Sequence, residues 1–112
     1  MIARLETLLI AAAREKRLMT YAEVARALEL PPPHTIHQAA LLIEAMMAHH
    51  AAAGAPQLAS LVVSRARGGL PAPGFFALLA ELGLYDGPAD GPAAQAFHAG
   101  EVARCFAAAA EG

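Results

Sequence analysis

Three consecutive prolines, Pro31 to Pro33, constrain the fold more than any other feature of this chain, because each of the stretches on either side begins like a helix. Proline lacks a backbone N–H and disfavours a helical residue before it, so a preceding helix must end there. Upstream, Thr20 and Glu23 have the spacing of a capping box, in which hydroxyl and carboxylate satisfy free N–H groups. Downstream, Thr35 and Gln38 have the same spacing. The pattern predicts two helices joined by a proline turn.

Apolar periodicity predicts further helices around this unit. A first helix is expected from Ile2 to about Arg17, and the helix after Thr35 should end at Gly54. The expected inward-facing residues are Ile2, Leu5, Leu9 and Ala12 in the first helix, Val24, Ala25 and Leu28 in the second, and Ile36, Ala40, Ile43 and Met47 in the third. Residues 58–63 have the short apolar pattern of a strand, and the glycines and prolines of residues 64–74 predict a loop.

This layout is typical of a winged helix, and a chain of 112 residues suits a single domain. We therefore predict a mostly α fold with one short strand or β-ribbon, forming one winged-helix-like domain over residues 1–112. Its parts are a helix-turn-helix at about 20–53, a wing-like loop at about 64–74 and C-terminal helices over 75–110. Arg65 and Arg67 lie where a wing would be.

Composition limits the classes of partner. Hydrophobic residues make up 57% of the chain and charged residues only 16%, which predicts exposed apolar surface and therefore a second copy or another protein as partner. The formal net charge of −2 argues against non-specific DNA binding, so any contact with DNA requires a local basic face. A single cysteine and no long apolar run favour the cytoplasm and no membrane partner.

The stretch Thr20-Tyr21-Ala22-Glu23-Val24-Ala25 resembles the start of the winged-helix domain of methylated-DNA alkyltransferases and alkyltransferase-like proteins. That family opens this helix with Thr-Tyr-Gly-Glu and a hydrophobic–Ala pair. The resemblance continues through a second helix to Val62-Val63 and covers about half of the chain. It implies a winged-helix fold and DNA-facing roles for Thr20 and Tyr21, the latter beside the DNA backbone.

The same comparison implies that alkyl transfer is lost. The family's Pro-Cys-His-Arg motif is missing, because residues 57–60 read Gln-Leu-Ala-Ser and the only cysteine, Cys105, lies far along the chain. The arginine that family members insert into the duplex should fall near residues 36–40, where no arginine is found. The resemblance therefore implies a fold and a DNA-binding surface, without the reaction.

A recognition helix contacts base edges with its first residues, which here are Thr35, His37 and Gln38. Glutamine can bond adenine on two edges, and threonine can contact bases or phosphate. The residues predicted to contact phosphate are Arg14, Lys16, Arg17, Arg65 and Arg67. The alternative is that Thr35 and Gln38 only cap a helix and that the arginines only keep the protein soluble.

The stretch GGLPAPGFF, residues 68–76, predicts a shaped loop that runs into a helix. Adjacent Phe75 and Phe76 are not expected to face the same side of a helix. Together with Leu70 and the alanine-rich last helix they are a predicted partner interface, since exposed aromatic residues are enriched at interfaces. Packing of the three residues in the core is the alternative.

No catalytic, cofactor or metal site is predicted. His34, His37, His49 and His50 lack the converging ligands that zinc needs and are interpreted as surface residues. Cys105 has no base nearby in sequence and is expected to be a small buried hydrophobe. The predicted function is a non-enzymatic DNA-binding or transcription-regulatory domain of bacterial winged-helix type, with duplex DNA as partner. The alternative is a protein–protein interaction module that keeps the fold without binding nucleic acid.

Overall fold

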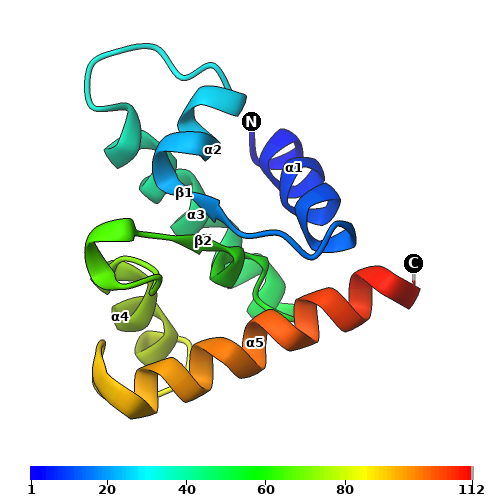
Figure 1. The fold of residues 1–112 in the computed structure, drawn as a ribbon, viewed down its shortest axis with the longest axis vertical. Coiled ribbons are helices and arrows are strands. Elements are labelled where there is room, and N and C mark those ends of the chain that lie inside the picture. Colours follow the sequence, from blue (N-terminus) through cyan, green and yellow to red (C-terminus); the bar gives the residue numbers. More distant parts are fainter. Residues whose placement is uncertain (112) are drawn as a thin grey trace.

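A computed structural model describes residues 1–111, which are mostly helical (Figure 1). The helices are α1 (Ile2–Arg14), α2 (Tyr21–Ala27), α3 (Thr35–Ala52), α4 (Pro73–Glu81) and α5 (Gly91–Glu111). The strands are β1 (Met19–Thr20) and β2 (Val62–Val63), and short 3-10 turns cover Leu58–Leu61 and Arg65–Arg67. The prediction of a mostly α fold with one short strand element is confirmed.

The first capping box forms as predicted. The Glu23 backbone N–H donates to Thr20 Oγ1 at 3.1 Å, and the Thr20 N–H donates to Glu23 Oε1 at 2.8 Å. The helix ends before the prolines, and its expected inward-facing residues Val24 and Leu28 are buried. Local side-chain chemistry therefore determines where α2 begins and ends.

The second predicted capping box is wrong. The residue that caps α3 is His34, in a left-handed conformation with φ of 58°, and no side chain caps this end. Thr35 is the first helical residue, and the Gln38 side-chain amide donates to the carbonyls of Pro31 at 2.7 Å and Pro33 at 2.8 Å. The proline turn leaves carbonyls without partners, and Gln38 satisfies two of them. The C-terminal end of α3 lies where it was predicted, because Gly54 follows the helix in a left-handed conformation with φ of 66°.

The strand predicted over 58–63 is mostly a 3-10 turn. Both the N–H and the hydroxyl of Ser60 donate to the Gln57 carbonyl, at 3.0 and 2.5 Å, which curls the chain before Val62. The remaining strand, β2, pairs in parallel with β1, with Met19 opposite Val62 and Thr20 opposite Val63. A two-residue strand shows no alternation in sequence, so β1 was not predicted.

The end of the first helix and the structure of the wing-like loop also differ from prediction. The first helix ends at Arg14 rather than about Arg17, and Lys16 adopts a left-handed φ of 53°. The predicted wing-like loop is a 3-10 turn closed by an antiparallel bridge between Ser64 and Leu70, with Gly68 at φ of 64°. The segment after β2 is thus a closed turn rather than an extended ribbon.

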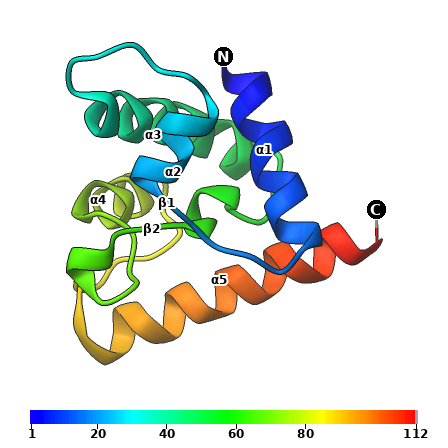
Figure 2. The same cartoon turned by 45° about the horizontal axis from the view of Figure 1, so that its top comes forward.

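The apolar core lies where α1, α2, α3 and α4 meet the first 3-10 turn (Leu58–Leu61) and α5. Figure 2 shows α5 running along one face beneath α1 and α4. Its largest fully buried apolar side chains include Leu5, Leu9, Ile43, Met46, Met47, Leu61 and Leu79. Ile36 is an exception to the predicted α3 stripe, because 55% of its surface is exposed. Within residues 1–111, no helix is both long and apolar enough to cross a bilayer.

Candidate functional site

A groove of about 370 Å³ lies between the start of α2, the start of α3 and the turn after β2. The residues that line it include Thr20, Glu23, Arg26, Ile36, Ser64 and Arg65. A second hollow of about 400 Å³ shares Arg26 and Ile36 with it and extends to Thr35 and Glu29. We call the first hollow the arginine groove, because it is lined by Arg26 and Arg65, which are both exposed.

The arginine groove has two cations without ion-pair partners and one carboxylate that is already bound. Neither Arg26 nor Arg65 forms an ion pair within residues 1–111. The pKa of Glu23 is lowered, chiefly by the hydrogen bond from the Thr20 backbone N–H and then by nearby Arg65 and Arg17. Arg17 itself pairs with Glu15 at 3.0 Å at the surface. The groove therefore favours an anionic partner.

Tyr21 lines the arginine groove but is mostly buried, and its predicted place beside a DNA backbone stays a prediction. Only 7% of its surface is exposed, and its hydroxyl accepts the Ala72 backbone N–H at 3.0 Å. Burial raises the pKa of this phenol above its usual value. Tyr21 thus joins the start of α2 to the segment before α4, and α2 cannot release it to a ligand without losing this contact.

Arg67 is held within the protein and is not a free phosphate ligand. Its Nε donates to the Pro71 carbonyl at 2.9 Å, and its guanidinium also donates to the carbonyl of Ala89. The side chain is half-buried and ties the turn after β2 to the loop before α5. Of the two predicted wing arginines, only Arg65 is exposed and unpaired.

The predicted base-reading residues do not form a base-reading set. The Gln38 amide is already donating to two proline carbonyls, so it cannot also make the two-edge contact with adenine. Thr35 is half-buried beside the second hollow, whereas His37 is exposed. Along α3 the chain has no arginine or lysine, and Glu44 is its one charged residue. Direct base readout by α3 therefore lacks its usual cationic and amide donors.

Arg14 is separated from the arginine groove. It is exposed at the end of α1 and lines a different cavity, which α1 forms with α5. A phosphate contact at Arg14 would thus belong to another face of the molecule. The structure brings together Thr20, Tyr21 and Arg65 from the predicted set, with Arg17 nearby, and adds Arg26, which was not predicted from sequence.

The predicted partner interface lies in the core. Leu70, Phe75 and Phe76 have exposed fractions of 5%, 2% and 3%. The two phenylalanine rings pack edge to face with centroids 5.1 Å apart, and Phe76 packs edge to face against Tyr85 at 5.8 Å. Both rings fit inside because α4 contacts the core on one side and the loop before α5 on another. Core packing, the alternative, is the correct interpretation.

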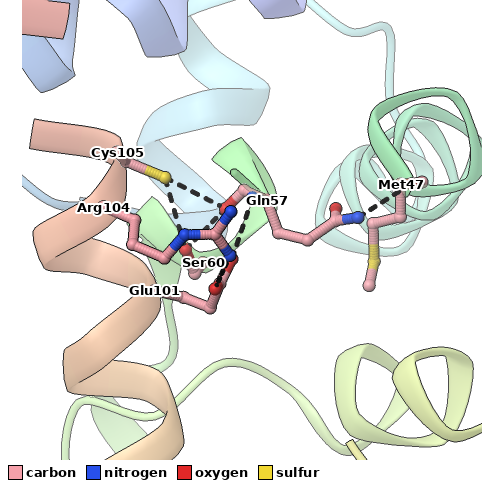
Figure 3. A network of polar contacts seen from close by, with 6 residues as sticks. All are labelled: Met47, Gln57, Ser60, Glu101, Arg104 and Cys105. Atoms are coloured by element: carbon pink, nitrogen blue, oxygen red, sulfur yellow. Dashed lines mark hydrogen bonds and ion pairs between the residues drawn. The ribbon is translucent and has the colours of Figure 1, made fainter. Parts of the chain in front are cut away.

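A buried polar network joins the first 3-10 turn, Leu58–Leu61, and the preceding Gln57 to α5 (Figure 3). Glu101 Oε2 accepts the Gln57 backbone N–H at 3.0 Å, and the Gln57 side chain donates to the Met47 carbonyl at 3.0 Å. Cys105 Sγ donates to the Gln57 carbonyl at 3.3 Å and lies 3.7 Å from Ser60 Oγ. The sequence signal for this network is a stripe on one face of α5, formed by Ala94, His98, Glu101 and Cys105.

This network is structural rather than nucleophilic. Burial raises the pKa of the Cys105 thiol to about 11, so the thiolate is scarce at neutral pH. Ser60 donates its hydroxyl proton to a carbonyl, and His98 Nε2 donates to the Ser60 carbonyl at 2.7 Å rather than to its hydroxyl. Among residues 1–111, no base therefore contacts the Ser60 hydroxyl in a way that would activate it.

His50 is buried, contrary to its interpretation as a surface residue. It is 6% exposed, and its Nε2 lies 3.1 Å from Glu6 Oε2 on α1. Across residues 1–111, no three His, Cys, Asp or Glu side chains converge as a metal site would require.

No protein-family model matches the sequence, and comparisons with curated proteins and with solved structures gave no match either. The resemblance to methylated-DNA alkyltransferases therefore stays a prediction.

Proposed function

We propose that this chain is a non-enzymatic, winged-helix-like module that binds duplex DNA through phosphate contacts in the arginine groove. The observation that carries the proposal is the pair of exposed, unpaired arginines, Arg26 and Arg65, on one concave surface. Guanidinium groups match phosphate oxygens with two parallel hydrogen bonds. The order of elements from α1 to the turn after β2 also supports a winged-helix arrangement.

The proposed contact positions the protein on the duplex without reading sequence, because phosphate contacts carry no base information directly. Thr20 and Ser64 supply hydroxyl groups beside the two arginines. The chain has a formal net charge of −2, so we expect modest affinity, with Kd in the range of about 10⁻⁴ to 10⁻⁶ M that is typical of non-specific binding.

The test is fluorescence anisotropy of a labelled random-sequence duplex, titrated with protein from low to moderate salt. Each phosphate contact contributes about −0.9 to the slope of log affinity against log salt. Contacts by Arg26 and Arg65 predict a total slope of about −1.8. Arg26→Ala and Arg65→Ala should each weaken binding and reduce the slope by about one contact.

Arg14→Ala is the matched control, because this exposed arginine lines a different cavity. It should leave both the affinity and the slope close to those of the wild type. Absence of binding at low salt would overturn the proposal. So would binding that Arg14→Ala weakens as much as Arg65→Ala does, because the contact would then depend on overall charge and not on the groove.

A second candidate function is a protein-interaction module that uses the outer face of α3. Its outward residues are His37, Leu41, Ala45, Ala48 and Ala52, which are all exposed and include no Asp, Glu, Lys or Arg. Leu41, which is 54% exposed, adds a large aliphatic side chain to this face. Sedimentation equilibrium tests this function in its simplest form, a pair of identical chains. Leu41→Glu should convert a dimer to a monomer, whereas Leu84→Glu, at another exposed leucine, should not.

We also propose the cytoplasm as the compartment. Cys105 is the single cysteine, and it is buried within a hydrogen-bonded network rather than placed for a disulfide. This usage fits a reducing environment.

A further inference from the structure

A second cavity, of about 350 Å³, lies between α1, the end of α3, the segment before the first 3-10 turn and α5. Its walls are mainly aliphatic and include Ile10, Pro56, Leu58 and Ala109. Its polar residues are Glu6, Arg14 and His50. A concave apolar surface of this size with a few polar groups is typical of small-molecule sites. We call it the α1–α5 pocket.

The α1–α5 pocket is separate from the arginine groove. Figures 1 and 2 both show the C-terminal ends of α1 and α5 side by side at one edge of the molecule, away from the turn that follows β2. No residue lines both hollows. An inference about this pocket therefore stands independently of DNA binding.

The wall that α5 contributes is held in place by the buried network. Glu101 and Cys105 both bond to Gln57 at the start of the 3-10 turn, and Cys105 also lines the pocket (Figure 3). These contacts join α5 to the segment that provides Pro56 and Leu58. The pocket is thus formed between elements that the network holds together, which favours a preformed site.

Charge selects the kind of ligand. Glu6 Oε2 accepts from His50 Nε2, so this carboxylate already has a partner. Arg14 is exposed and forms no ion pair within residues 1–111. The His50 side chain is buried and its Nδ1 has no hydrogen-bond partner among the described residues. The charged group of this pocket that still lacks a partner is the Arg14 guanidinium, which favours an anion.

Spacing along α1 limits the ligand further. Glu6 and Arg14 lie on the same helix, and at 1.5 Å per residue their separation along its axis is about 12 Å. Ile10 lies between them on the pocket wall. A carboxylate bound at Arg14 therefore places an apolar chain along Ile10 and Leu58, with its far end toward Glu6. A second carboxylate at that end would be repelled by Glu6.

We propose that the α1–α5 pocket binds a small monocarboxylic acid with an apolar chain, with the carboxylate at Arg14 and the chain between α1 and α5. The test is a two-dimensional amide NMR titration of the whole chain with octanoate, below its micelle concentration. Octanoate should shift the amides of Ile10, Leu58 and Ala109 in a saturable way. The dicarboxylate suberate should bind at least about tenfold more weakly, because its second carboxylate meets Glu6.

Variants locate the site. Arg14→Gln should weaken octanoate binding about fivefold, as loss of one exposed ion pair implies. Arg4→Gln, at an exposed arginine of the same helix that lines another hollow, should leave binding unchanged. Ala109→Phe should fill the pocket and abolish the shifts, and an unchanged amide spectrum elsewhere shows that this variant is folded.

Three results would overturn the proposal. Suberate that binds as tightly as octanoate would remove the charge argument. Equal affinity of wild type and Arg14→Gln would remove Arg14 from the site. Shifts confined to the outer face of α3 would show that octanoate binds exposed apolar surface and not the α1–α5 pocket.

Discussion

Tyr21→Phe separates a structural role of this side chain from the DNA-contacting role that sequence resemblance implies. The substitution removes one oxygen and leaves the ring in the core. That oxygen accepts the Ala72 backbone N–H at 3.0 Å, so the variant leaves a half-buried donor without a partner. An unsatisfied buried donor costs about 1–3 kcal/mol. Ala72 is only half-buried, so we expect the free energy of unfolding to fall by about 1 kcal/mol, the low end of that range.

The assay is urea unfolding at pH 7, followed by the far-ultraviolet circular dichroism of the helices. With a slope of about 1–2 kcal/mol/M, the midpoint should fall by about 0.5–1 M and the slope should be unchanged. Tyr85→Phe is the matched control. The Tyr85 hydroxyl donates to the exposed Pro88 carbonyl, which water can satisfy instead, so its midpoint should move much less.

Two further measurements complete this prediction. Burial raises the folded-state pKa of Tyr21 above its ordinary value of 10.0. The contribution of the neutral Tyr21 hydroxyl to stability is therefore fully present below pH 10 and is lost as pH rises through the folded pKa. Above pH 10, Tyr21→Phe should lose stability less steeply than the wild type. Affinity for duplex DNA should be unchanged. A variant with wild-type stability and weakened DNA binding would refute the structural role.

Four other predictions concern single side chains. Thr20→Ala removes the side-chain acceptor of the α2 cap and should lower the unfolding free energy by about 1 kcal/mol. The pKa of Glu23 is lowered on folding, so the wild type should lose stability as pH falls below about 4.5 and through the folded pKa. Glu23→Gln should show a smaller loss of stability over this pH range, measured by thermal melts. Cys105, with a pKa raised from 9.0 to about 11, should react with iodoacetamide at pH 8 about a hundredfold more slowly in the folded than in the unfolded chain, followed by mass spectrometry; equal rates would contradict its burial. Gln38→Ala should lower the urea midpoint slightly, because the carbonyls of Pro31 and Pro33 lose their hydrogen-bond donor. If this variant instead changed the preferred DNA sequence, Gln38 would be a base-reading residue after all.

The features that were predicted correctly from sequence depend on contacts within one helical turn. Thr20 and Glu23 are three residues apart, so their mutual hydrogen bonds form wherever α2 begins. The prolines end a helix and Gly54 accepts a left-handed conformation through their own covalent geometry. Leu5 and Leu9 are buried together because helical periodicity places them on one face. None of these features needs a distant partner.

The second capping box shows where local spacing is insufficient. Thr35 and Gln38 have the same separation as Thr20 and Glu23, yet the Gln38 amide bonds to the carbonyls of Pro31 and Pro33. A glutamine can donate as well as accept, whereas a glutamate carboxylate only accepts. The turn before α3 offers free carbonyls, and its geometry decides which partner the amide finds.

The functional surface was decided by tertiary contacts. The Tyr21 side chain meets Ala72 across 51 residues, the Arg67 side chain meets Ala89 across 22, and the Glu101 side chain meets the Gln57 backbone across 44. Each of these side chains is polar and looks available for a ligand in sequence, but each is bound within the protein once the chain folds. Arg26 and Arg65 remain free because no carboxylate or carbonyl of the described chain reaches them. Sequence alone therefore determined the helices and their local caps, whereas the identity of the free cations depended on which polar groups the tertiary fold had already paired.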